Sequence, residues 1–188
     1  MASAFRRKSS TGTRYATRAR MPHPYPPHWA HCSYVGRIDY SLTYVTDNRR
    51  ELFTNASTVD FVRSHFLRAA AEERFEEIAY CFMPDHLHVI VSGRTDESDC
   101  KAFIKAAKQY SSYYWKQRHG YRLWERYGHD RVIRTDWELA MTIGYLVANP
   151  VRERLVAHPR DYPFLGSSKY TVDELLEWCE YSEAMLLG

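Results

Sequence analysis

The sequence lacks any long apolar run. None of its 188 residues belongs to an apolar stretch approaching the roughly 20 residues that a membrane-spanning helix needs. The apolar segment typical of a secretory signal peptide is also missing near the N-terminus. The sequence therefore predicts neither a membrane-spanning nor a secreted protein.

Paired cysteines are missing as well. The four cysteines, Cys32, Cys81, Cys100 and Cys179, are widely separated, and none belongs to a Cys-x-x-Cys pair. Such spacing is typical of unpaired thiols in a reducing compartment, where disulfide bonds do not persist. Cys81 lies inside an apolar stretch, so we interpret it as a small core residue.

Acidic residues are absent from the first twenty positions, which contain six of the 26 basic residues of the chain. The remaining 20 basic residues face 23 acidic ones, so the body of the chain is slightly acidic. Basic arms often bind nucleic acid, although solvated disorder without a function explains the pattern nearly as well. We name Arg6, Arg7 and Lys8 as candidate DNA contacts. Four prolines within residues 22–27 exclude a regular helix there.

Three segments after residue 36 have the pattern of β-strands. The segment "RIDYSLTYVT" alternates apolar and polar residues, and "FEEIAYCFM" and "HLHVIVSG" are short apolar runs separated by a Pro-Asp turn. A fourth strand or loosely paired hairpin is expected in "RLWERYGHDRVIRT", with its turn at Gly128. These patterns predict a sheet.

Three further segments have apolar stripes at helical spacing. They predict helices at residues 57–73, with Ser57 or Thr58 as the cap, and at residues 97–118, followed by Gly120. The third helix is expected in "DWELAMTIGYLVANP", where the proline should stop it.

The order of these elements indicates an α+β fold. Strand, helix, strand, strand, helix, strand and helix follow one another, which is typical of a ferredoxin-like α/β sandwich with a central antiparallel sheet. We expect a basic, proline-rich arm at residues 1–36, the sandwich domain at residues 37–166, and a helical extension at residues 167–188.

Two histidines stand one residue apart in the segment "MPDHLHVIV". Because side chains alternate between the faces of a strand, His86 and His88 should project together, while Leu87 and Val89 face the other way. Two neighbouring imidazoles can bind one divalent metal ion. A chance pairing on a solvent-exposed face is the alternative, since the chain has nine histidines.

The third predicted helix contains Tyr145 and Asn149 one turn apart, and hence on one face. A tyrosine can act as a covalent nucleophile, and an amide oxygen can bind a hard metal ion. The alternative is that Tyr145 packs in the core and that Asn149 closes the helix before the proline.

Together, "MPDHLHVIV" and the later "GYLVANPV" resemble the REP-associated tyrosine transposases, a branch of the single-tyrosine HUH endonucleases related to insertion-sequence transposases. The segments "LWERYGHDRVIR" and "HPRDYPFLGSS" extend the resemblance over residues 37–166. It implies that His86, His88 and Asn149 are metal ligands and that Tyr145 is the nucleophile. Single-tyrosine relatives often have glutamine at the third ligand position. The asparagine at this position resembles the REP-associated branch instead.

The resemblance implies a metal-dependent endonuclease and strand transferase that acts on single-stranded DNA through a 5′-phosphotyrosine intermediate. The implied cofactor is Mg²⁺ or Mn²⁺, and the implied partners are single strands with hairpin-forming repeats. We expect a monomer rather than a dimer, located at the nucleoid in a bacterial cytoplasm. Lys101, Lys105 and Lys108 share one helix face and are candidate DNA contacts.

Other functions and another nucleophile remain open at this point. A non-catalytic nucleic-acid-binding module would bind DNA without a covalent adduct. A zinc hydrolase that uses Asp85 with the two histidines would turn over a small ester or amide. Tyr110, Tyr113 and Tyr114 compete with Tyr145 as nucleophiles, although no candidate metal ligand lies at a matching spacing from them.

Overall fold

The structure, a computed structural model, describes residues 34–178. The strands are β1 (Asp39–Val45), β2 (Phe75–Met83), β3 (His86–Gly93), β4 (His129–Ile133) and β5 (Leu165–Gly166). The helices are α1 (Ala56–Glu72), α2 (Cys100–His119) and α3 (Asp136–Arg152), with short 3-10 helices η1 (Asp47–Arg49) and η2 (Pro159–Asp161). The predicted order of elements is confirmed, and β5 is an addition to it. The candidate DNA contacts Arg6, Arg7 and Lys8 lie outside the described residues.

The five strands form one antiparallel sheet in the order β4-β1-β3-β2-β5. This sheet confirms the predicted α+β fold. β5 is only two residues long and pairs with β2, where Gly166 lies opposite Tyr80. A Cβ at Gly166 would lie 2.7 Å from the Tyr80 hydroxyl, so glycine permits this close approach.

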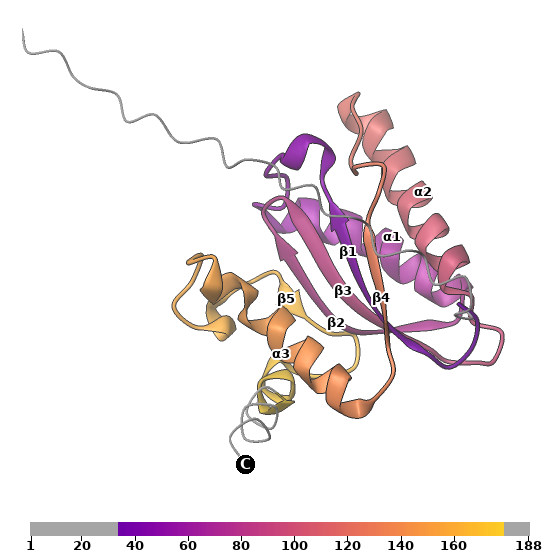
Figure 1. Cartoon of the computed structure of the whole chain (residues 1–188). Coiled ribbons are helices and arrows are strands. Elements are labelled where there is room, and N and C mark those ends of the chain that lie inside the picture. Colours follow the sequence, from indigo (N-terminus) through magenta and orange to yellow (C-terminus); the bar gives the residue numbers. More distant parts are fainter. Residues whose placement is uncertain (1–33, 179–188) are drawn as a thin grey trace, which may run out of the picture. The chain divides into compact units, whose positions relative to one another are not determined.

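Helices cover both faces of the sheet (Figure 1). α1 and α2 pack on one face, over a core to which β3 contributes Leu87 and Val89. α3 packs on the other face, over a second apolar cluster that includes Cys81 and Ile90. Since successive residues of a strand point to opposite faces, the two histidines of β3 must lie on the α3 face.

The helix termini correct one prediction and confirm another. Asn55, rather than Ser57 or Thr58, caps α1, because its side-chain oxygen accepts a hydrogen bond from the Thr58 backbone nitrogen at 3.0 Å. The first helical turn therefore begins earlier than the apolar stripe suggested. Gly120 ends α2 as predicted, with a φ of 78° that suits glycine.

Pro150 does not stop α3, so that prediction is wrong. The helix continues to Arg152, and the Glu153 backbone nitrogen donates to the Asn149 carbonyl to close it. Proline removes one backbone donor, but the donors that follow it still bond back, since the Leu155 nitrogen also donates to the Pro150 carbonyl at 2.8 Å. These two additional residues matter because they bring Arg152 onto the helix that carries Tyr145.

The described part of the predicted C-terminal extension packs on the same core as the domain. The Ser168 hydroxyl donates to the Glu77 carboxylate at 2.9 Å, and Leu175, in a helical segment at residues 172–178, is fully buried in the cluster under α3. Within residues 34–178, no helix is long and apolar enough to span a membrane.

Candidate active site

His86 and His88 project together on the α3 face, as the alternation predicted. Their Nε2 atoms are 3.1 Å apart, and their rings are nearly perpendicular, at 88°. Both side chains are partly exposed, whereas Leu87 between them is buried in the opposite core. The two ring nitrogens therefore converge on one point that is accessible from solvent.

A neighbour holds the other nitrogen of each ring. His86 Nδ1 donates to Asp85 Oδ1 at 2.6 Å, and Arg49 donates to the second Asp85 oxygen at 3.0 Å. His88 Nδ1 lies 3.0 Å from the Thr43 hydroxyl. Such outer partners fix the ring orientation of metal-binding histidines. Asp85 itself contacts Nδ1 rather than the point between the Nε2 atoms, so it does not complete the ligand set of the zinc-hydrolase alternative.

The Thr43 hydroxyl can serve two tautomers of His88. A hydroxyl both donates and accepts, so it can donate to Nδ1 while Nε2–H of His88 donates to His86 Nε2. It can equally accept from Nδ1–H, which leaves both Nε2 lone pairs directed at the same point. In one tautomer of His88, the two histidines are joined by a hydrogen bond. In the other, their two Nε2 atoms can bind one cation.

The electrostatics of the site favour a neutral His88 and an ionised Asp85. Burial, assisted by the adjacent His86 and opposed by Asp85, lowers the pKa of His88 to about 4. Burial opposes ionisation of Asp85, yet His86 and Arg49 together hold the pKa of its carboxyl below the usual value. Metal binding requires a neutral imidazole, and an ionised Asp85 can accept the hydrogen bond from Nδ1 of the neighbouring His86.

Tyr145 of α3 lies beside the histidine pair. Its ring centroid is 6.3 Å from that of His88, and the two rings are nearly perpendicular. The side chain is 53% exposed, so the alternative of a core tyrosine is not supported. Arg152, two turns later on the same helix, places its guanidinium carbon 4.5 Å from the tyrosine ring centroid. The Tyr145 ring therefore has both the His88 ring and the Arg152 guanidinium as neighbours.

Asn149 lies one turn after Tyr145 and is 6% exposed. Its side-chain Nδ2 has no hydrogen-bond partner among the residues that the structure describes. An unpaired buried amide costs about 1–3 kcal/mol, and rotation can exchange its oxygen and nitrogen. No three His, Cys, Asp or Glu side chains come together in the described part of the chain. A third protein ligand would therefore be of another type, and the amide oxygen of Asn149 fits that role.

The competing tyrosines lie on α2, across the sheet from the histidine pair. The Tyr110 hydroxyl donates to Glu72 at 2.5 Å, and the Tyr114 ring stacks on His65 of α1. Tyr113 is exposed on the same helix. The sheet separates all three hydroxyls from the histidines, so Tyr145 is the tyrosine that the fold brings to this site.

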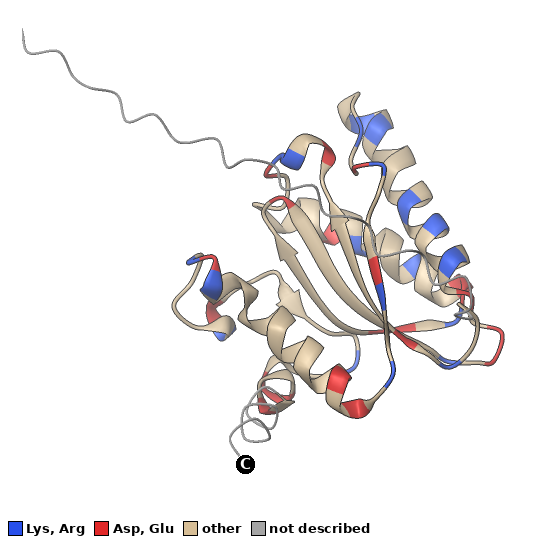
Figure 2. Cartoon of the chain, in the orientation of Figure 1, with Lys and Arg blue, Asp and Glu red and all other residues tan. Residues whose placement is uncertain are grey.

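The three predicted lysines of α2 have different environments. Lys101 and Lys105 are exposed, among other basic residues along the helix (Figure 2). Lys108 instead donates to the backbone carbonyls of Glu125 and Arg126 at 2.9 and 3.2 Å, and burial lowers its pKa. Its ammonium group therefore fixes the backbone of the segment that precedes β4. A role of Lys108 in DNA contact has less support than the same role of Lys101 and Lys105.

Three residues around the site were missed by reasoning from the sequence. Thr43 is one of two polar residues in the alternating strand "SLTYV", and its contact with His88 depends on how β1 pairs with β3. Arg152 was detectable, since it follows Tyr145 by seven positions and such residues share a helix face. The contact between Arg49 and Asp85 joins residues 36 positions apart and leaves no local pattern.

Comparisons with known proteins identify a family and a shared fold. The family described as "Transposase IS200 like" matches residues 34–130, which include both histidines and end before Tyr145. A Haemophilus influenzae protein assigned as a REP-associated tyrosine transposase is 27% identical over 138 residues, or 66% of this chain and 77% of that protein. A solved REP-associated tyrosine transposase bound to a REP hairpin has the same fold. Its TM-score is 0.61 at 19% identity, over 73% of this chain and 80% of that one. The predicted family resemblance is confirmed.

Proposed function

The chain belongs to the IS200-like transposase family, and we propose that it cuts and rejoins single-stranded DNA through a 5′-phosphotyrosine intermediate on Tyr145. The observation that carries this proposal is the convergence of His86 Nε2 and His88 Nε2, 3.1 Å apart, beside an exposed tyrosine ring. A solved protein of the same fold is bound to a REP hairpin, which supports hairpin-bearing strands as the substrate class.

We assign His86, His88 and Asn149 as the ligands of Mg²⁺ or Mn²⁺. Two adjacent ligands of an octahedral ion with bonds of about 2.1 Å are about 3.0 Å apart, close to the observed 3.1 Å between the Nε2 atoms. Imidazole suits Mn²⁺ better than Mg²⁺, and an amide oxygen suits both. The bound ion would neutralise a non-bridging phosphate oxygen and orient the scissile phosphate.

The covalent step exchanges one phosphodiester for another. The Tyr145 hydroxyl oxygen bonds to phosphorus, and the bond between phosphorus and the 3′-oxygen breaks. The tyrosine loses one proton and the leaving oxygen gains one, so a 3′-hydroxyl and a 5′-phosphotyrosine result. Attack by another 3′-hydroxyl reverses the step and joins two ends. Because the histidine pair, Asn149 and Tyr145 lie in one chain, we propose that a monomer suffices.

The proposed chemistry forms a covalent protein–DNA adduct, whereas a non-catalytic binding module would form none. Tyr145→Phe keeps the ring that contacts His88 and Arg152 and removes only the hydroxyl. With a labelled hairpin-bearing single strand and Mn²⁺, we expect wild type to give an adduct and a 3′-hydroxyl end on a denaturing gel. The variant should lose at least about 10³-fold in rate while it still binds the DNA.

Tyr113→Phe, at an exposed tyrosine on α2, is the matched control and should cleave like wild type. An adduct formed by Tyr145→Phe would contradict the assignment of the nucleophile. DNA binding by wild type with no adduct under any metal condition would instead favour a non-catalytic binding module.

A further inference from the structure

We infer that the part of the α3 face over β1 and β4, which no helix within residues 34–178 covers, binds the single-stranded DNA that flanks the cleaved phosphate. Thr43 of β1 and His129 and Arg131 of β4 form this surface, which we call the β1–β4 track. The inference rests on the proposed function, since it takes the substrate strand to be held at His86 and His88.

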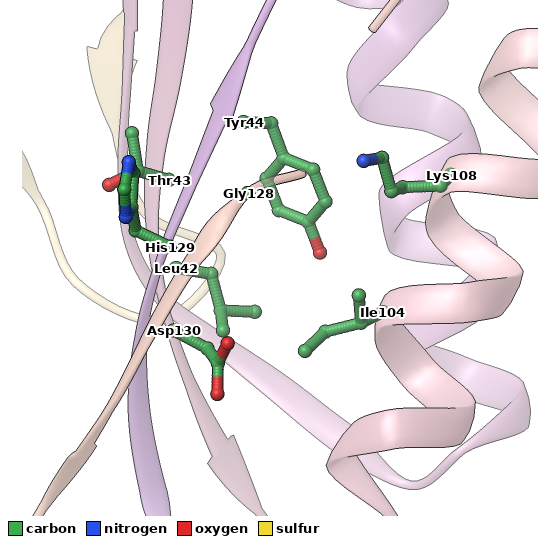
Figure 3. Close-up of a pocket in the computed structure, with 8 residues that line it drawn as sticks. All are labelled: Leu42, Thr43, Tyr44, Ile104, Lys108, Gly128, His129 and Asp130. Atoms are coloured by element: carbon green, nitrogen blue, oxygen red, sulfur yellow. The ribbon is translucent and has the colours of Figure 1, made fainter. Parts of the chain in front are cut away.

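The register of the sheet places His129 in line with His88. His88 pairs with Thr43 on β1, and Thr43 pairs with His129 on β4. Directly paired residues point to the same face, and Figure 3 shows Thr43 and His129 on one side of the strands with Tyr44 on the other. Neighbouring strands are about 5 Å apart, so His129 is about 10 Å from His88 across the sheet. A strand bound at the histidine pair would therefore reach His129 within a few nucleotides.

Arg131 extends the track along the edge strand. Ile133, two residues further, is buried in the cluster under α3, so alternation places His129 and Arg131 on that same face. Both are exposed, because α3 covers the Ile133 end of β4. Arg131 forms no ion pair within residues 34–178. Asp130 between them turns to the other face and accepts from the Tyr34 hydroxyl at 2.6 Å.

The chemistry of the track suits a polyanion with exposed bases. A guanidinium can donate two hydrogen bonds to phosphate oxygens, and an imidazole offers a ring face on which a base can stack. His129 and Arg131 are about 7 Å apart along β4, comparable with neighbouring phosphates of an extended strand. Asp39 shares the face and lies at the far end, opposite Ile133, where it would repel phosphates. We therefore expect the DNA strand to run from His88 across β1 to the β4 edge, away from Asp39.

Arg131→Gln tests the track, because it removes the charge from an exposed side chain. Fluorescence anisotropy would compare a hairpin carrying ten-nucleotide single-stranded flanks on both sides with the same hairpin without flanks. We expect the variant to bind the flanked DNA about 5–10-fold more weakly and to lose about 0.7 from the log–log salt slope. It should bind the unflanked hairpin like wild type. His129→Ala should weaken flanked binding by a smaller factor.

Arg94→Gln is the matched control, since it makes the same charge change just beyond the opposite end of β3 and should leave both affinities unchanged. Equal binding of flanked DNA by wild type and Arg131→Gln would overturn the inference, as would an equal loss on the unflanked hairpin. The binding assay requires no cleavage. If no adduct forms but Arg131→Gln weakens binding of the flanked DNA, the proposed function is refuted and the β1–β4 track is supported. If the adduct forms but Arg131→Gln binds the flanked DNA like wild type, the proposed function is supported and the track is refuted.

Discussion

The two faces of the sheet receive different side chains from the same strands. Towards α1 and α2, β1 and β3 direct Leu42, Leu87 and Val89, which are buried in an apolar core. Towards α3, the residues between them include His86 and His88, which are partly exposed and form the candidate metal site. A single strand therefore supplies stability through one face and chemistry through the other. Substitutions at adjacent positions of β3 should then have separable effects.

The largest effect is expected for His88→Ala. Loss of this imidazole should abolish Mn²⁺ binding in calorimetry and lower DNA cleavage by at least about 10³-fold. The free energy of unfolding should change by only about 1–2 kcal/mol, because His88 is partly exposed and loses two hydrogen bonds, to Thr43 and to His86. His65→Ala, on α1 across the sheet, is the control and should bind Mn²⁺ like wild type. Equal Mn²⁺ affinity in wild type and His88→Ala would remove the basis of the ligand assignment.

Leu87→Ala should have the opposite signature. This residue is 1% exposed, and truncating a buried leucine costs about 2–5 kcal/mol of unfolding free energy. At a temperature where the variant remains folded, its Mn²⁺ affinity should match wild type, because its side chain points away from the site. Chemical denaturation followed by calorimetry measures both quantities. A folded Leu87→Ala protein that fails to bind Mn²⁺ would show that the two faces are not separable.

Arg152→Gln should lower the cleavage rate constant about tenfold. The guanidinium contacts the Tyr145 ring and so puts a positive charge beside the proposed nucleophile, where it could stabilise an approaching phosphate. Mn²⁺ affinity should not change, which distinguishes this role from damage to the metal site. Arg152→Lys keeps the charge and should recover most of the rate in single-turnover assays. If the glutamine variant cleaves as fast as wild type, the contact has no part in the reaction.

The last prediction concerns the reactivity of a thiol in the apolar half of the α3 face, and it changes neither the site nor the fold. Burial raises the pKa of the Cys81 thiol to about 12, and the residue is inaccessible under α3. At pH 8 the thiolate fraction is then about one in ten thousand, so alkylation should be at least about a hundredfold slower than in the unfolded chain. Peptide-level mass spectrometry after iodoacetamide treatment measures this ratio. Rapid alkylation of Cys81 in the folded protein would mean that α3 opens readily.

Local patterns in the sequence were sufficient for the main features of the α3 face. Alternation in β3 placed His86 and His88 together, and helical spacing placed Tyr145 and Asn149 one turn apart on α3. These predictions succeeded because each depends on a single period of one element. The end of α3 was misjudged, because Pro150 removes only its own donor and the backbone donors after it still bond back. With the helix ended at Pro150, Arg152 was left off it, although its spacing of seven residues from Tyr145 was visible in the sequence.

Features that depend on pairing between distant strands could not be predicted. β4 lies beside β1 rather than beside β3, which aligns His129 with Thr43 and His88 across three strands. No local pattern encodes this register, since it follows from how the whole sheet assembles. The hydrogen bond between Thr43 and His88 and the β1–β4 track both belong to this class.

The most direct test of the account locates the covalent adduct in the chain. Wild-type protein would be trapped with a hairpin-bearing single strand and Mn²⁺, digested with a nuclease and trypsin, and analysed by mass spectrometry. The tryptic peptide of residues 135–152 contains Tyr145 as its single tyrosine, and that of residues 109–116 contains Tyr110, Tyr113 and Tyr114. We predict that the nucleotide remnant is found on Tyr145, in the peptide of residues 135–152. A remnant on the peptide of residues 109–116 would place the nucleophile across the sheet from the histidine pair and contradict the account.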